Sequence, residues 1–158
     1  MTGVQTCALP ILTYEFKLRP NVQFHDGAIL TSADVKATYE RIRKPPQGVA
    51  SLRQSQFSDV VSIETPDSST VVFKLSKPNA TMLTLFASPF NCLYQARRIE
   101  AEPNFFARNI MGSGPFRFSA HLAGAEWRGV RFENYFRPGL PYLDGYTVIN
   151  LDPSALAN

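Results

Sequence analysis

The chain has 158 residues, of which 44% are hydrophobic and 12% aromatic, and its formal net charge at pH 7 is +3. This composition suits about one packed domain, and no run approaches the roughly 20 apolar residues of a membrane-spanning helix. The basic residues form only small clusters, such as Arg41, Arg43 and Lys44, and lack the basic stripe with interleaved aromatic residues that marks a nucleic-acid binder. We therefore expect no nucleic-acid partner.

The first eleven residues, Met1–Ile11, match the translation of a sequencing-adapter string read from a GTG start. A cleaved signal peptide is the alternative, but the stretch has no Lys or Arg at its start and no apolar run of signal length. We interpret residues 1–11 as non-native and residues 12–158 as the native sequence. Asp152–Asn158 has the pattern of a turn and the first turn of a helix, but the sequence ends before the helix could continue. We therefore expect an internal fragment that is truncated at both ends and lacks its signal peptide.

A strand, a turn and an amphipathic helix are predicted between Tyr14 and Ile42. Tyr14, Phe16 and Leu18 alternate with charged residues, which is the period of a half-buried strand, and Pro20 ends the strand. Thr31 and Asp34 have the spacing of a capping box, with Asp in place of the commoner Glu. The helix that follows has its inward stripe at Val35, Thr38, Tyr39 and Ile42.

The turn before that helix, His25-Asp26-Gly27, is the one constellation worth testing for catalysis. A histidine and a carboxylate could form an acid–base pair. Adjacent residues on a turn or strand tend to point in different directions, however, so a structural turn is the favoured interpretation. The other native histidine is His121, so histidines alone cannot build a metal site, and we expect no metal and no cofactor.

A β-hairpin is the clearest element of the middle of the chain. Residues 60–64 and 70–75 are rich in β-forming residues, and residues 65–69 between them have turn chemistry. Upstream, the two prolines and the glycine of residues 44–48 break the first helix, and residues 50–57 are predicted as a short helix that carries Leu52 and Phe57.

A second helix is predicted after Asn79, which is a plausible N-cap. Its apolar residues are interpreted as a core stripe, namely Met82, Leu83, Leu85 and Phe86. Ser88-Pro89 ends this helix, and residues 90–94 are predicted as a short buried strand. Cys92 is the single native cysteine, so no disulfide or zinc framework follows from it, and we expect a buried small hydrophobe, with a reactive thiol as the alternative.

The last third of the chain is predicted to contain a weak helix and several strands. The helix spans residues 96–102, and residues 103–110 are irregular or a single turn. The Gly112-Ser113-Gly114 segment lacks the spacing of a nucleophile elbow and the lysine of a phosphate loop, so we interpret it as a structural turn. Strands are expected at residues 116–120 and 146–151, and residues 127–132 show strand-like alternation.

Several ordered stretches together resemble one protein family. The segment FKLRPNVQFHDG followed by LTSADV, the hairpin VSIETPDSSTVVFKL, the turn GSGPF and the tail YFRPGLPYLDGY are similar to landmarks of the family 5 extracellular solute-binding proteins. The family usually has GTGPF where this chain has Ser113. The resemblance covers nearly all of residues 13–157, and the order of the landmarks is more specific than any one motif.

The resemblance implies the fold and the function. The expected fold class is α+β, a partial first lobe of a two-lobed periplasmic binding protein (type II, cluster C-like), with a mixed sheet, packed helices and a β-hairpin. Such proteins capture a peptide or similar solute for an ABC importer, and two lobes close over the ligand before docking on the permease. By that resemblance the protein is not an enzyme, and it is periplasmic or lipid-anchored and monomeric when full length.

Ligand-contacting residues are predicted in one segment only. Ser88, Phe90 and Asn91 form a small-polar-aromatic group at an element boundary, where binding residues tend to lie. The alternative for the same three residues is a helix stop and the start of a buried strand.

Two other functions stay open at this point. One is a small secreted hydrolase that uses His25 and Asp26, and the other is a basic RNA-binding module whose affinity would fall with salt.

Overall fold

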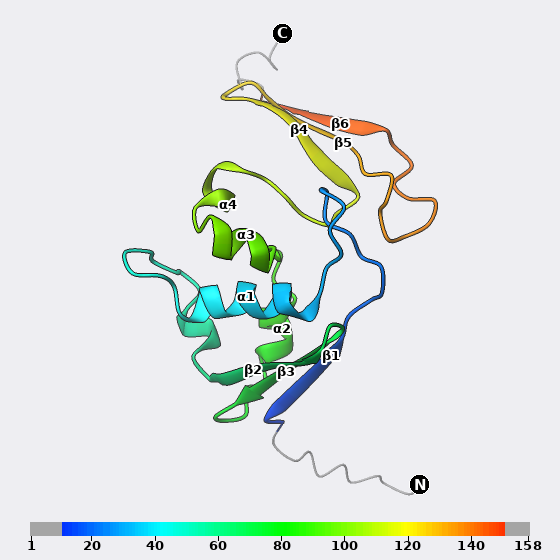
Figure 1. Cartoon of the computed structure of the whole chain (residues 1–158). Helices are drawn as coiled ribbons and strands as arrows, with labels where there is room; N and C mark the ends of the chain where they lie inside the picture. The colour runs from blue at the N-terminus through cyan, green and yellow to red at the C-terminus, as the bar shows by residue number, and fades with distance from the viewer. Residues whose placement is uncertain (1–10, 151–158) are drawn as a thin grey trace, which may run out of the picture. The chain divides into compact units, whose positions relative to one another are not determined.

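The computed structural model describes residues 11–150, which form two compact units. Unit 1 contains the described residues 11–20 and 31–102, and unit 2 contains residues 21–30 and 103–150. Each unit has strands and short helices (Figure 1), so the predicted α+β class is confirmed. The predicted non-native stretch 1–11 falls outside the described residues except for Ile11, and so does the predicted helix start at residues 152–158.

Unit 1 contains an antiparallel sheet of three strands in the order β1-β3-β2. The strands are β1 (Thr13–Lys17), β2 (Val60–Asp67) and β3 (Thr70–Leu75). Phe16 lies opposite Val71, and Ile63 lies opposite Phe73. The alternation in the sequence thus places one apolar face of each strand on the same side of the sheet.

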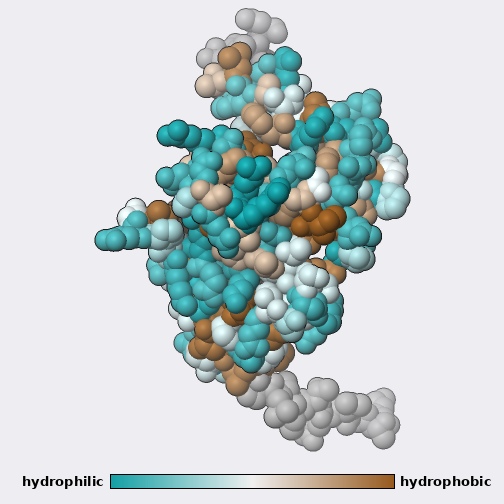
Figure 2. All heavy atoms as spheres, in the orientation of Figure 1, coloured by the Kyte–Doolittle hydropathy of each residue, from teal (hydrophilic) through white to brown (hydrophobic). Residues whose placement is uncertain are grey.

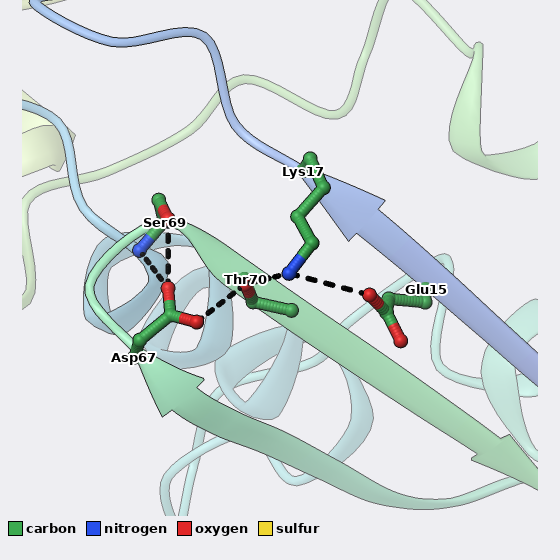
Figure 3. Close-up of polar contacts among 5 residues, drawn as sticks. All are labelled: Glu15, Lys17, Asp67, Ser69 and Thr70. Atoms are coloured by element: carbon green, nitrogen blue, oxygen red, sulfur yellow. Dashed lines mark hydrogen bonds and ion pairs between the residues drawn. The ribbon is translucent and has the colours of Figure 1, made fainter.

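The hairpin turn between β2 and β3 is held by one carboxylate. Asp67 Oδ1 accepts hydrogen bonds from Ser69 N and Ser69 Oγ, both at 2.7 Å, and Asp67 Oδ2 accepts one from Thr70 Oγ1 at 2.7 Å (Figure 3). These bonds hold the pKa of the Asp67 carboxyl well below its usual value, at about 2. The same Thr70 hydroxyl accepts a bond from Lys17 Nζ at 2.7 Å, which ties β1 to the turn.

The predicted capping box starts helix α1 (Ser32–Arg43). Thr31 N donates to Asp34 Oδ2 at 2.8 Å, and the Thr31 hydroxyl donates to the same oxygen at 3.0 Å. The other carboxylate oxygen of Asp34 accepts from Ala96 N at 2.8 Å, at the first residue of helix α3 (Ala96–Ala101). One buried side chain therefore caps two helices.

The core of unit 1 lies between α1 and its sheet. Figure 1 shows α1 across one face of the sheet, and the four predicted stripe residues of α1 are all buried. Tyr39 packs edge-on against Phe57, Phe73 and Phe86 with ring centroids 5.1 to 5.6 Å apart. Such edge-to-face pairs add to the stabilisation that burial alone gives.

Three predictions for unit 1 are wrong. Residues 50–57 form only a 3₁₀ turn, η1 (Ser55–Phe57), in which Phe57 is buried while Leu52 is 95% exposed, so the two residues do not share the packed face that a helix would give them. Residues 90–94 form no strand, and Phe90 is 74% exposed. Cys92 is exposed and not buried, since it follows directly on a tight turn at the surface.

The second helix of unit 1 is shorter than its apolar stripe. Asn79 Oδ1 accepts from Thr81 N at 3.0 Å, and α2 (Met82–Phe86) begins after this turn. Met82 is fully buried and Leu85 and Phe86 pack against the core, as predicted, but Leu83 is 57% exposed. A five-residue helix has room for only one buried side, so Leu83 points away from the core.

Unit 2 contains one helical turn and a second antiparallel sheet. The turn is α4 (Phe105–Arg108), and the sheet has the strands β4 (Phe116–Leu122), β5 (Glu126–Arg131) and β6 (Gly145–Ile149) in that order. Tyr146 crosses over Gly129, where an added Cβ would lie 2.4 Å from Tyr146 Cε1. A glycine at this position is what lets the tyrosine ring lie across the sheet and reach Phe116, 5.1 Å away between ring centroids.

Candidate functional site

Ser88, Phe90 and Asn91, the predicted ligand residues, are brought together in one turn of unit 1. Asn91 N donates to Ser88 O at 3.1 Å, which closes the turn directly after α2. The Phe90 ring is 74% exposed, whereas Ser88 and Asn91 are half-buried. The structure thus places the three residues at an element boundary, and ligand contact by them stays a prediction.

Arg53 holds this turn from a distant part of the chain. Arg53 Nη1 donates to Asn91 Oδ1 at 2.7 Å and to the carbonyl oxygen of Phe90. Asn91 Nδ2 donates to Leu85 O at 2.6 Å, back to the preceding helix. The side-chain amide of Asn91 therefore has protein partners on both its oxygen and its nitrogen.

Helix α1 fixes the segment that follows the turn. Tyr94 N donates to Thr38 Oγ1 at 2.8 Å, and Ala96 N donates to Asp34 Oδ1 at 2.8 Å. Both partners lie on the first two turns of α1, and Asp34 is itself the second residue of the capping box. The amphipathic helix read from the sequence is thus the support on which the segment 88–96 is built.

A hollow of about 360 Å³ lies beside this turn, and all its lining residues belong to unit 1. Its aromatic wall consists of Phe16, Phe73 and Phe86, and its aliphatic wall consists of Leu18, Val35, Val71 and Leu93. The polar lining residues are Tyr39, Asn91, Lys17 and Arg19. An apolar hollow with a few polar groups is the usual form of a small-molecule site.

Among the residues that line the hollow, Tyr39 has a strongly shifted pKa. Burial raises the pKa of the Tyr39 phenol to about 12, although the charge of Arg53 and a hydrogen bond with Asn91 act in the opposite direction. The phenol is therefore neutral at physiological pH and acts as an apolar body with one polar tip.

His25 and Asp26 lie in unit 2 and do not form the acid–base pair that a hydrolase would need. His25 Nε2 lies 3.1 Å from Gly114 O, and the Asp26 carboxylate accepts from Ala28 N at 3.1 Å. His25 Nδ1 is buried and has no hydrogen-bond partner among residues 11–150. His25 N also donates to Gly112 O at 2.9 Å, so the histidine holds the Gly112–Gly114 turn in place.

The sequence reasoning missed two residues of the hollow and its support. Tyr39 was predicted only as part of a core stripe, and Arg53 was not singled out at all. A tyrosine on the inward stripe of a helix is a usable signal, because its hydroxyl needs a polar partner when buried. No local signal identifies Arg53, whose bond to Asn91 joins residues 38 positions apart.

Residues 11–150 contain neither a candidate membrane-spanning helix nor a candidate metal-binding cluster. None of the helices described there is long and apolar enough to cross a membrane. Within the same range, no group of three His, Cys, Asp or Glu side chains is placed to hold a metal ion.

Comparison with known families gives one match along almost the entire chain. The sequence model of the bacterial extracellular solute-binding proteins, family 5 Middle, matches residues 11–158. The glutathione-binding protein GsiB of Escherichia coli O1:K1 is 27% identical over 136 residues, which is 86% of this chain and 26% of GsiB. A Brucella ovis protein, named as a candidate ABC transporter peptide-binding protein, is 32% identical over 139 residues, 84% of this chain and 25% of its own length.

Solved structures agree with the sequence comparison. The periplasmic binding protein AgaA from Agrobacterium tumefaciens R10, in complex with agropinic acid, superposes with a TM-score of 0.80 at 33% identity. The match covers 87% of this chain and 28% of AgaA. The chain thus spans about a quarter of the length of the proteins that it resembles.

Proposed function

The chain belongs to family 5 of the bacterial extracellular solute-binding proteins, and we propose that it is part of the solute-binding component of an ABC importer for a peptide or similar small solute. The family match over residues 11–158 carries the proposal. Support for a peptide comes from the names of GsiB and of the Brucella ovis relative, since glutathione is itself a tripeptide.

The same proposal includes the setting in which the protein works. The complete protein captures its solute outside the inner membrane, in the periplasm or on a lipid anchor, and delivers it to the transmembrane permease subunits. It acts as a monomer, and it binds without catalysing a reaction. Capture follows if the solute binds the closed form of two lobes more tightly than the open form.

The hydrogen bonds in unit 2 favour this function over the hydrolase. His25 Nε2 is hydrogen-bonded with Gly114 O, and the Asp26 carboxylate accepts from Ala28 N. The two side chains are therefore not arranged as the hydrogen-bonded acid–base pair that would activate a nucleophile. The histidine acts as a structural link between two turns.

The test uses the complete gene product encoded by the frame that contains residues 12–158. Its thermal unfolding is measured with glutathione, with a set of di- and tripeptides and with single amino acids. A ligand present at about 100 times its dissociation constant stabilises the folded state by about 2.7 kcal/mol, so the midpoint rises by several degrees. No shift with any peptide would contradict the peptide class, and turnover of any of these compounds that His25→Ala abolishes would favour the hydrolase.

A further inference from the structure

Arg53 supports the turn of residues 88–91 through one of its terminal nitrogens, and it also lines a second hollow of unit 1, which we call the arginine hollow. We propose that the Arg53 guanidinium binds a carboxylate group of the solute, while the wall of the arginine hollow accepts a short aliphatic chain beside that carboxylate. The proposal rests on the proposed function, because it names a chemical group of the solute that the receptor would capture.

The guanidinium of Arg53 has donors that the protein does not use. Both of its hydrogen bonds, to Asn91 Oδ1 at 2.7 Å and to the carbonyl oxygen of Phe90, start from Nη1. Within residues 11–150, neither Nε nor Nη2 of Arg53 has a hydrogen-bond partner. These two nitrogens form one edge of the planar group, and such an edge binds the two oxygens of a carboxylate through parallel hydrogen bonds.

The positive charge of Arg53 is not offset by a carboxylate of the described chain. Its partners are an amide oxygen and a carbonyl oxygen, which carry no net charge, and Arg53 forms no ion pair within residues 11–150. Glu40 of α1 is already paired with Arg43 and Lys44. Because Arg53 is half-buried, its charge is less well screened by water than that of an exposed side chain, and it favours an anion from solution.

The arginine hollow has a volume of about 310 Å³, and all the described residues that line it belong to unit 1. Its charged lining residues are both positive, since Arg41, which has a partner of its own in the protein, joins Arg53 there. No acidic residue of the described chain lines it. Much of the remaining wall is aliphatic and comprises Ile42, Pro45, Val49 and Leu52. A ligand that combines a carboxylate with a short aliphatic chain matches this lining.

The guanidinium is held in place before a ligand arrives. The turn of residues 88–91 fixes Nη1, and Asn91 is itself fixed because its Nδ2 donates to Leu85 O at 2.6 Å. A side chain that is already immobilised loses less conformational entropy when it binds a ligand. A lysine at this position would supply the charge without the planar pair of donors.

The first experiment compares two probes of nearly the same shape. The isotopically labelled chain is titrated at low ionic strength with isovalerate and with the uncharged isovaleramide, and amide chemical shifts are followed by NMR. Isovalerate should bind at least about tenfold more tightly and shift the amides of Ser51, Arg53 and Tyr94. Equal binding of the two probes, no binding of isovalerate, or shifts confined to other parts of the chain would overturn the proposal.

A matched pair of variants separates the guanidinium from the general charge of the chain. Arg53→Gln removes the charge and the planar pair of donors, and it should weaken isovalerate binding at least about tenfold. Lys36→Gln removes one positive charge from an exposed position of α1 outside the arginine hollow, so binding should stay within about twofold of the parent. An equal loss in both variants would show that isovalerate responds only to net charge and would contradict the proposal.

A further variant leaves Arg53 and its bonds to the turn unchanged. Ser51→Glu adds a carboxylate to the lining of the arginine hollow, where it should pair with the guanidinium or repel the probe, and it should abolish isovalerate binding. Thermal unfolding verifies that each variant is folded. A folded Ser51→Glu chain that binds isovalerate as tightly as the parent would overturn the proposal, whatever the effect of Arg53→Gln on the turn.

The complete gene product separates this inference from the proposed function. Binding of the peptide Ala-Ala-Leu is compared with binding of its C-terminal amide. If the free carboxylate form binds at least about tenfold more tightly and Ser51→Glu removes the difference, both proposals stand. If the two forms bind equally, the receptor function holds and Arg53 does not bind the carboxylate of the solute. If isovalerate binds at Arg53 but no peptide binds, the peptide function fails while the carboxylate site stands.

Discussion

At the residue scale, Tyr39 shows how one side chain serves both packing and polarity. Its ring contacts three phenylalanines of the core, and its hydroxyl reaches Asn91 at the edge of the hollow. The helical period predicts that Tyr39 faces inward, and it does. The partner of its hydroxyl lies more than fifty residues away, and no local pattern identifies such a pair.

The raised pKa of Tyr39 gives a prediction about alkaline pH. Burial raises the pKa of this phenol in the folded protein from its usual 10.0 to about 12, so the stability that the neutral phenol contributes is complete below pH 10 and is lost as pH rises towards 12. Tyrosinate absorbance should show one phenol titrating near pH 12 in the parent chain, and that step should be missing in Tyr39→Phe. Tyr142→Phe, at an 86% exposed site, is the control and should leave that step in place. A titration near pH 10 for every tyrosine would contradict the structure.

At the element scale, the N-termini of α1 and α3 share one capping residue. The spacing of Thr31 and Asp34 predicts the cap on α1, and the structure confirms it. The second bond, from Ala96 N to the same carboxylate, joins residues 62 positions apart and follows only from the packing of the two helices. Local capping patterns can therefore be read from the sequence, whereas the contacts that join elements depend on the tertiary fold.

Asp34→Ala should destabilise the chain more than the loss of a single cap. Removal of the carboxylate leaves the N–H groups of Thr31 and Ala96 without their acceptor, and we expect a loss of about 2–3 kcal/mol in the free energy of unfolding. Glu100→Ala on the exposed side of α3 is the control and should change it by less than about 0.5 kcal/mol. Denaturant unfolding measures both variants, and an equal effect of the two would show that the shared cap is unimportant.

At the scale of the whole molecule, the apolar surface is unevenly distributed. In the view of Figure 2, the hydrophobic residues at the surface lie in separate areas among hydrophilic ones. The sheet of unit 2 carries one such area, because Phe118, Gly129 and Tyr146 lie opposite one another across its three strands. Phe118 and Tyr146 are each 39% exposed and Val148 is 53% exposed. Exposed sheet faces and unpaired edge strands of this kind favour association.

The chain on its own should therefore self-associate. Light scattering after size-exclusion chromatography is expected to give a mass above 17.6 kDa that rises with concentration. Val148→Lys should lower that mass, whereas Val61→Lys, at a similarly exposed site on β2, should not. A parent chain that stays monomeric and melts cooperatively would contradict this prediction.

The division into units is the part of the fold that the sequence did not predict. The strands, the capped helix and the hairpin follow from periodicity and turn chemistry within short windows. The assignment of residues 21–30 to the same unit as residues 103–150 depends on the bonds between His25 and the Gly112–Gly114 turn, which no local window contains.

The discontinuous composition of unit 2 has a consequence for biosynthesis. Phe24 is 1% exposed in the finished structure, and the partner of the neighbouring His25 ring is 89 residues further along the chain. On the ribosome, all strands and helices of unit 1 have been synthesised once residue 102 has emerged, whereas residues 103–150, with which residues 21–30 form unit 2, have not. We expect Phe24 and Val22, which are buried in the folded chain, to be exposed on the nascent chain during that interval, so that this short loop can be bound by a chaperone that recognises apolar segments.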